Sequence, residues 1–290
     1  GGVYKSTDGG LTWELKGLEG TQAIGRVVVH PTNVDWVYVA ALGHPWGANE
    51  ERGLYRTRDG GETWERVHYV SEDAGFVDVD MHPQDPNIIW ATSWKRVRGP
   101  YFLQSGGPGS AIWKTIDGGD TWEEVLGGGL PETEKGRIEI AIAPSYPQVI
   151  YALIEAEMPE EPDESGDKHG SGLYRSGDGG ESWEFMNSNN SRPFYYSNVW
   201  VAPDDPDLVF WSSLFFSRDG GKTVGNPGQS VHSDFHALWW DSENPDHFIL
   251  GNDGGIAITW DRGGNYDFPN AIPMGQFYAV SYNMDTPYRV

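Results

Sequence analysis

The stretch GLYRSGDGGESW (172–183) decides the fold of this chain, because close variants of it recur along the sequence. An acidic residue among glycines would suit a metal-binding loop, but a binding or catalytic loop is needed only once. The other copies are GGVYKSTDGGLTW (1–13), GLYRTRDGGETW (53–64), AIWKTIDGGDTW (111–122), FFSRDGGKTV (215–224) and a decayed IAITWDRGGNYDF (256–268). Between them lies a second repeated module of two apolar runs around a polar turn: RVVVHPTNVDWVYVAA (26–41), FVDVDMHPQDPNIIWATS (76–93), RIEIAIAPSYPQVIYALI (137–154), SNVWVAPDDPDLVFWSS (197–213) and HALWWDSENPDHFILGN (236–252). Internal repetition at roughly 40 to 60 residues indicates a propeller or a solenoid.

One pair of modules, such as residues 26–66, contains four short apolar runs separated by turns. β-Branched and aromatic runs flanked by Pro, Asp and Gly predict two successive hairpins, whose strands we call A to D from the centre outward. Four antiparallel strands of this kind make one propeller blade. We therefore expect an all-β chain that forms a β-propeller of four-stranded antiparallel blades in a single domain. Its expected parts are a C–D hairpin at 1–16, five blades at 24–67, 75–125, 136–186, 195–224 and 235–268, and the start of a further blade at 277–290.

The repeated Asp is predicted to be structural. In the pattern S/T-x-D-x-G-x-T/S-W its carboxylate can accept hydrogen bonds from N–H groups of its own turn. The glycines supply positive φ angles, and the Trp covers the hairpin with a large apolar surface. Every blade needs such a turn, which explains the recurrence better than calcium binding does. The predicted structural residues are Asp8, Asp59, Asp117, Asp178, Asp219 and Asp261.

The composition excludes several classes of function. The chain has 20 basic and 43 acidic residues, a balance that disfavours a nucleic acid partner because a polyanion needs a basic face. It has no cysteine, and therefore no disulfide or thiolate site. No apolar run is long enough to insert into a membrane, and no phosphate loop or dinucleotide fingerprint indicates a cofactor. Because the chain begins and ends inside a repeat, we expect it to be part of a longer polypeptide. We also expect an extracellular, periplasmic or cell-surface location.

These motifs carry a resemblance to known proteins. STDGGLTW (6–13) resembles the Asp box, or BNR repeat, of sialidases, xyloglucanases and sortilin-type receptors. Across essentially the whole chain, the order of motifs is similar to bacterial Asp-box propellers described as sortilin-like or glycosyl-hydrolase-like: ALGHPWGANEERGLYRTRDGGETW (41–64), GGPGSAIWKTIDGGDTW (106–122), HALWWDSENPDHFILGNDGGIAITWDRG (236–263) and GQFYAV (275–280). The resemblance implies a seven-bladed or larger propeller, often in tandem, of which this chain is a part. The alternative is that the two terminal pieces close on each other to make six blades.

Antiparallel blades sort their connections onto two ends. The A–B turns and the Asp boxes share one end, and the irregular B–C and D–A segments share the other, where binding residues are expected on a rigid scaffold. Aromatic rings mixed with Arg, His and Asn suit a sugar or an extended peptide, although the aromatic side chains could instead plug the central funnel. The candidate ligand-binding residues are His44, Trp46, Arg96, Arg98, Tyr101, Arg192, Tyr195, Tyr196, His232, His236 and Asn252.

Alignment of the blades on their turn prolines adds a possible polar ring on the innermost strands. Arg26, Asp78, Glu139 and Asn198 take equivalent positions in this alignment. The ring could contact a ligand, or it could be a set of ion pairs that satisfy one another around trapped water.

HSDFH (232–236) is the sharpest local constellation. On an extended strand His232, Asp234 and His236 would share one side, so they could bind a transition metal, act on a substrate, or form structural hydrogen bonds. GNDGGIAITWD (251–261) resembles a xyloglucanase segment in which a catalytic Asp precedes a Gly-Gly turn, which implies Asp253 as a candidate carboxylate. Glycoside hydrolysis ordinarily needs two carboxylates, and the candidate partners are Asp234 and Asp78.

Three functions remain compatible with these motifs. The first is a non-catalytic recognition propeller of a secreted or surface protein, which binds a peptide or a glycan on its irregular end. The second is a glycoside hydrolase that acts on a polysaccharide through Asp253. The third is a structural module of an extracellular assembly that contacts another protein.

Overall fold

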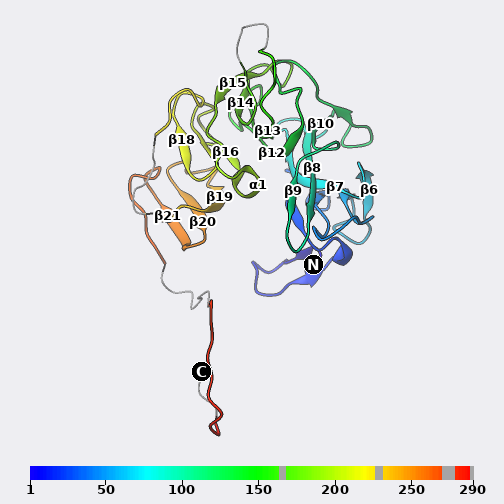
Figure 1. The fold of residues 1–290 in the computed structure, drawn as a ribbon, viewed down its shortest axis with the longest axis vertical. Coiled ribbons are helices and arrows are strands. Elements are labelled where there is room, and N and C mark those ends of the chain that lie inside the picture. The colour runs from blue at the N-terminus through cyan, green and yellow to red at the C-terminus, as the bar shows by residue number, and fades with distance from the viewer. Residues whose placement is uncertain (163–167, 226–230, 270–277, 288–290) are drawn as a thin grey trace.

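The structure, a computed structural model, describes residues 1–162, 168–225, 231–269 and 278–287. Five antiparallel sheets follow one another around a common centre, and a two-stranded hairpin precedes them (Figure 1). The hairpin consists of β1 (Tyr4–Lys5) and β2 (Glu14–Leu15). Blade 1 consists of β3 (Ile24–Val29), β4 (Val37–Ala41), β5 (Gly53–Thr57) and β6 (Glu65–His68). Blade 2 consists of β7 (Ala74–Met81), β8 (Ile89–Arg98), β10 (Ala111–Thr115) and β11 (Glu123–Glu124), with β9 (Leu103–Ser105) on an extension of β8.

The remaining blades continue the arc. Blade 3 consists of β12 (Lys135–Ile142), β13 (Ile150–Ala156), β14 (Gly172–Ser176) and β15 (Glu184–Asn187). Blade 4 consists of β16 (Val199–Val201), β17 (Val209–Trp211) and β18 (Phe215–Ser217), and blade 5 of β19 (Phe235–Trp240), β20 (Phe248–Asn252) and β21 (Gly255–Thr259). In blades 4 and 5 the outermost strand is reduced to single bridges, Phe216 to Gly225 and Ile258 to Asp267. The all-β propeller predicted from the repeats is confirmed.

The arc of blades is open between blade 5 and the N-terminal hairpin (Figure 1). Residues 278–287, expected to begin a further blade, form no strand and are exposed. Within the described part of the chain, no ladder joins them to β1 or β2, so the six-bladed closure is not formed. With no neighbouring strand beside it, this segment has no ladder partners for its N–H and C=O groups.

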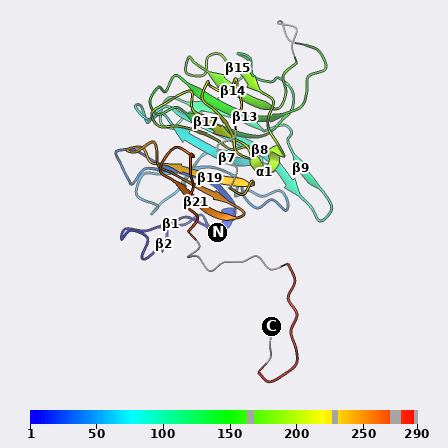
Figure 2. The ribbon, with the colours of Figure 1, turned by 90° about the vertical axis from the view of Figure 1, so that its left-hand side faces the viewer.

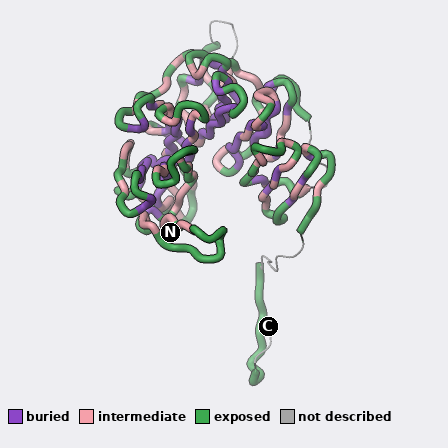
Figure 3. The backbone as a smooth tube through the Cα atoms, turned by 180° about the vertical axis from the view of Figure 1, so that it is seen from behind, coloured by how far each residue is buried: buried purple, intermediate pink, exposed green. Residues whose placement is uncertain are grey.

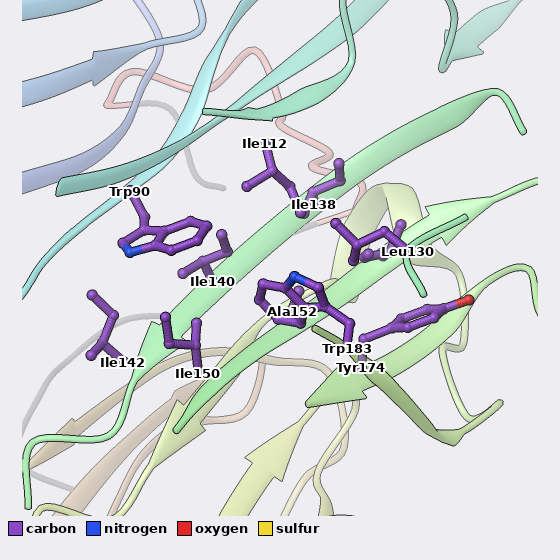
Figure 4. Packing of buried hydrophobic residues seen from close by; sticks show 11 residues of the cluster. Trp90, Ile112, Leu130, Ile138, Ile140, Ile142, Ile150, Ala152, Tyr174 and Trp183 are labelled. Carbon is purple, nitrogen blue, oxygen red and sulfur yellow. The ribbon is translucent and has the colours of Figure 1, made fainter. Parts of the chain in front are cut away.

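The hydrophobic core lies between the blades. Trp90 and Ile112 of blade 2 pack on Ile138, Ile140 and Ala152 of blade 3, and an equivalent cluster fills each neighbouring interface (Figure 4). Buried segments therefore run along the inner strands, while the turns and the C-terminal segment are exposed (Figure 3). Because both faces of an inner blade are covered, the central strands read as continuous apolar runs.

Each Asp box closes its own turn with hydrogen bonds. In the second copy, Asp59 accepts from the Thr63 N–H at 2.9 Å, from the Thr63 hydroxyl at 2.6 Å and from the Thr57 hydroxyl at 2.7 Å. In the decayed copy, Asn265 replaces the Thr and donates to Asp261 at 2.8 and 2.7 Å. In the second copy, the hydrogen bonds from Thr63 and Thr57 lower the pKa of Asp59 to about 2. Asp8, Asp117, Asp178 and Asp219 make the same set of bonds.

The same end of every blade carries the A–B turn. The first glycine of the box, Gly60 in blade 1, donates to a carbonyl of that turn, Asp35, at 2.9 Å. The equivalent bonds in blades 2 to 5 run from Gly118 to Asn87, Gly179 to Gln148, Gly220 to Asp207 and Arg262 to Asp246. We call this end the box pole and the opposite end, which carries the B–C and D–A segments, the loop pole. The box residues Gly118 and Gly119 have φ of 71° and 85°, a conformation that favours glycine.

The loop pole is more regular than the sequence indicates. Within 94–110, strand β8 continues to Arg98 and pairs with β9, which makes a projecting hairpin instead of an irregular loop. The segment 187–198 contains a short helix, α1 (Pro193–Tyr196), which lies at the centre of the ring in Figure 1. Figure 2 shows that β9 and α1 project on the same side of the molecule.

Candidate functional site

Helix α1 covers the central funnel at the loop pole. Phe194 packs on a small cluster of Leu42, Val77 and Trp94 from blades 1 and 2. On the other side, the Tyr196 ring lies 5.4 Å from the His236 ring of blade 5. The aromatic segment at 193–196 is thus a plug, while the neighbouring aromatic residues of the loop pole remain exposed.

Beneath α1, the innermost strands carry a network of charged groups. Arg26 Nε lies 2.8 Å from Asp78 Oδ1, and Arg26 Nη2 lies 2.6 Å from Glu139 Oε1. Arg137 Nη2 extends the network to Glu139 Oε2 at 3.4 Å and donates to Asn198 Oδ1 at 2.9 Å. The four residues aligned by sequence therefore meet, with Arg137 as an additional member. Together with Trp200 and His236, the network lines a cavity of about 140 Å³.

Burial changes the acidity of this network. Burial and the neighbouring Asp78 carboxylate raise the pKa of Glu139 to about 7, although Arg26 and Arg137 act in the opposite direction. Burial likewise raises the pKa of Asp80 to about 7; this carboxylate accepts from the N–H groups of Met81 and Ile142. The internal pairing favours the structural interpretation of the ring over direct ligand contact.

In four of the five innermost strands, a β-bulge lies at the level of this charged network and orients the polar side chains. The register shifts at Ile24/Arg26, Phe76/Asp78, Lys135/Ile138 and Phe235/Ala237. An extra residue at each site re-aims the side chains next to it. Arg137 and His236 both lie within such shifts, which explains how they reach the mouth of the funnel.

We call the first group of exposed candidates the arginine–aromatic rim: Trp46, Arg96, Arg98, Tyr101 and Phe102, on blades 1 and 2. The Arg98 guanidinium carbon lies 5.6 Å from the centre of the Trp46 ring, and the Arg98 N–H donates to the Pro45 carbonyl at 2.6 Å. Arg96 lies 4.8 Å from the ring of Trp94. Tyr101 and Phe102 occupy the tip of the β8–β9 hairpin, where Tyr101 is fully exposed.

The second group, the Asp–His cluster, joins blades 4 and 5: Tyr196, His232, Asp234, His236 and Asp253. The Tyr196 hydroxyl donates a short hydrogen bond to Asp234, and this bond raises the pKa of Tyr196. His236 Nε2 lies 3.2 Å from Asp253 Oδ1. The Asp253 N–H reaches the Asp234 carbonyl at 3.4 Å, so the two candidate carboxylates come from adjacent segments. Asn252 shapes the turn, because its side chain accepts from the Gly254 N–H at 2.8 Å.

The metal site considered for HSDFH is not formed. The strand begins only at Phe235, and Asp234 has a φ of 31°, so the three residues do not alternate along one extended segment. His232 Nδ1 instead faces Asp234 Oδ2 at 3.9 Å, while His236 turns to Asp253. Among the residues that the structure describes, no group of three or more His, Asp and Glu could hold a metal ion.

The other candidates are His44, Arg192 and Tyr195. His44 contributes its carbonyl, which accepts from Asn49 and Arg52. Arg192 precedes α1 with a φ of 45°, and Tyr195, which is half-exposed, accepts from Arg137 through its carbonyl. Arg52 and Arg137 could not be identified from the sequence. Each lies beside a more conspicuous motif, and each owes its position to contacts between blades.

Comparisons with known proteins agree with this architecture. The family model "Sortilin, neurotensin receptor 3" matches residues 1–128. Xyloglucanase Xgh74A of Acetivibrio thermocellus is 26% identical over 282 residues, which cover 83% of this chain and 29% of the relative. This chain thus spans less than a third of the xyloglucanase that it resembles.

Solved structures show the same fold. An ancestral GH74 enzyme superposes with a TM-score of 0.62 at 18% identity, over 91% of this chain and 34% of that one. The GH74 xyloglucanase of Xanthomonas campestris superposes with a TM-score of 0.53 at 15% identity, over 95% of this chain and 50% of that one. No helix in the described residues is long and apolar enough to cross a membrane.

Proposed function

We propose that this chain, an Asp-box β-propeller related to the xyloglucanases, is a recognition module that binds a glycan at its loop pole. The observation that carries the proposal is the grouping of exposed aromatic rings with arginine side chains in the arginine–aromatic rim of the loop pole. Trp46 is 62% exposed and Phe102 58% exposed, beside the fully exposed Tyr101. Exposed rings next to guanidinium and carboxylate groups provide stacking surfaces and hydrogen bonds for sugar rings.

The similarity to xyloglucanases supports a glycan over a peptide as the ligand, and a location outside the cytoplasm, where plant and microbial polysaccharides occur. The fold alone does not select between these ligands, because one fold hosts many functions. The aromatic rings and guanidinium groups of the arginine–aromatic rim, together with the polar groups of the Asp–His cluster, therefore favour a glycan.

A binding screen with a matched pair of variants tests the proposal. Trp13 provides the control, since it is as exposed as Trp46 but lies in an Asp box at the box pole. In a glycan array followed by calorimetry, Trp46→Ala should weaken binding of the best ligand about tenfold, the loss of one stacking contact worth about 1.4 kcal/mol. Trp13→Ala should bind as the unchanged protein does. Equal losses in both variants, or no glycan bound at all, would contradict the proposal.

A second candidate function is glycoside hydrolysis at the Asp–His cluster. The specific observation in its favour is that the Asp253 side chain is 61% exposed and is paired with His236, with Asp234 on the adjacent segment. Such an arrangement supplies one solvent-facing carboxylate next to a group that can transfer protons. A polysaccharide-hydrolysis assay should lose turnover in Asp253→Asn and retain it in Asp35→Asn, an exposed Asp of the box pole. Unchanged turnover in Asp253→Asn would remove Asp253 from the reaction.

A further inference from the structure

Arg52 is a buried cation without a carboxylate partner. Its side chain is completely buried, and its Nη2 donates to three carbonyls, those of His44 and Gly47 at 3.3 Å and that of Arg96 at 3.0 Å. Within the described residues, its Nε and Nη1 have no hydrogen-bond partner. A buried charge is costly unless it is paired. Burial accordingly lowers the pKa of Arg52.

Two further arginines of the rim repeat this pattern. Arg96 and Arg98 stack on Trp94 and Trp46, and neither forms an ion pair within the described part of the chain. Arg96 Nε is buried without a partner. Burial lowers the pKa of Arg96, and the neighbouring Arg137 and Arg98 lower it further. Asp73 acts on Arg52 through space but lies beyond ion-pair distance.

This accumulation of positive charge is unexpected in a chain of net charge −23. Carboxylates are abundant, and other arginines use them: Arg26 pairs with Asp78, and Arg262 pairs with both Asp204 and Asp246. Three like charges held close together without a counter-ion repel one another. An external anion at the rim would relieve this repulsion.

We propose that the cluster of Arg52, Arg96 and Arg98 binds the carboxylate of a uronic acid residue, and that the glycan ligand is an acidic polysaccharide. The inference rests on the proposed glycan recognition and names its chemical class. Arg96 and Arg98, which are half-buried, make the contacts. Arg52 lies beneath them, contributes its charge and holds the Arg96 carbonyl.

The geometry of the rim suits a uronate better than a neutral sugar. A guanidinium binds a carboxylate through two parallel N–H···O bonds, which fixes the orientation of the sugar that carries it. Trp46 and Tyr101, adjacent to the arginines, offer ring faces on which that sugar can stack. A neutral polysaccharide would use the rings and leave the three charges without a counter-ion.

The first test compares ligands that differ only in charge. Calorimetry would use hexagalacturonate, its carboxyl-reduced neutral counterpart and a xyloglucan oligosaccharide. We expect hexagalacturonate to bind about tenfold more tightly than the carboxyl-reduced form, as a charge-assisted contact requires. Binding of the neutral sugars alone would overturn the uronate inference and leave glycan recognition standing. Binding of none of the three, together with a silent glycan array, would overturn both.

The second test locates the site. Arg96→Gln and Arg98→Gln should each weaken hexagalacturonate binding about tenfold while changing the affinity for the neutral counterpart less than about twofold. Arg218→Gln is the matched control, because Arg218 also stacks on an aromatic ring, Phe216, but belongs to an Asp box. Circular dichroism verifies that each variant is folded. Equal effects on charged and neutral ligands, or an effect of Arg218→Gln, would overturn the assignment.

Discussion

A buried arginine lies near each end of strand β5, Arg52 directly before it and Arg56 within it, and the two have opposite surroundings. Arg56, at the box pole, contacts Asp120 at 2.7 Å and Glu65 at 2.8 Å and also donates to the Gly118 carbonyl. Among the described residues, Arg52, at the loop pole, has only carbonyl acceptors. Burial acts to lower the pKa of both, but at Arg56 the two carboxylates reverse the effect and raise it. These two nearby arginines therefore differ in their partners: carboxylates contact Arg56, whereas carbonyls contact Arg52.

This difference extends to the two poles as a whole. At the box pole every turn repeats one set of internal hydrogen bonds, as Asp59 and Asp261 show. At the loop pole, exposed rings and unpaired guanidinium groups stand on a projecting hairpin. A structural device satisfies its own polar groups, whereas a recognition surface keeps some of them available for a ligand.

The largest effect that we predict separates charge pairing from position in the fold. Arg26 lies near the loop pole but pairs with the buried Asp78 and Glu139. Arg26→Ala leaves the buried Asp78 without its ion-pair partner and Glu139 with Arg137 alone, and should reduce the free energy of unfolding by about 3 kcal/mol. Arg58→Ala, which breaks an exposed pair with Asp120 at the box pole, should cost less than about 0.5 kcal/mol. Urea denaturation measures both variants, and similar losses would show that pairing does not decide stability here.

The repeats predicted the propeller and its two poles from sequence, because each blade must form the same hairpins independently. The hydrogen bonds within each turn could also be predicted, because the Asp117 carboxylate bonds to groups of its own turn. The ring of Arg26, Asp78, Glu139 and Asn198 also emerged from the alignment of the blades, and pairing within the ring was one of the two roles that the sequence left open for it.

Other contacts between blades could not be predicted from the sequence. The position of Arg137 depends on a bulge, and the packing of Phe194 across the funnel depends on the path of 187–198. The shared side expected for His232, Asp234 and His236 is not formed for a local reason, the positive φ of Asp234, which ends the expected alternation one residue before the strand begins. Backbone irregularities of this kind leave little trace in the residue pattern.

A second prediction compares one Asp from each region as pH changes. The pKa of Asp59 is lowered to about 2, so its contribution to stability is present above 3.8, its ordinary value, and is lost as pH falls through about 2. The pKa of Asp80 is raised to about 7, so its contribution is present below 3.8 and is lost as pH rises through about 7.

Carboxyl-resolved NMR should therefore show Asp80 titrating near neutral pH while Asp59 stays charged down to about pH 3. Asp80→Asn should flatten the decline in stability between about pH 4 and 7, by less than the effect of Arg26→Ala, since the N–H groups of Met81 and Ile142 bond the Asp80 carboxylate and offset part of the cost of its charge. Two carboxyl groups that titrate together near their ordinary value would remove the contrast between the regions.

The smallest predicted effect is a gain in stability. If Arg96 is kept for a ligand, its unpaired charge beside Arg98 and Arg137 opposes folding of the free protein. Arg96→Gln should then raise the free energy of unfolding by about 0.5 kcal/mol, because the like-charge repulsion is relieved. Arg218→Gln, which removes an unpaired arginine outside the cluster, should leave it unchanged within about 0.2 kcal/mol. Thermal denaturation without ligand measures the difference, and a loss of stability in Arg96→Gln would mean that this arginine supports the fold as Arg56 does.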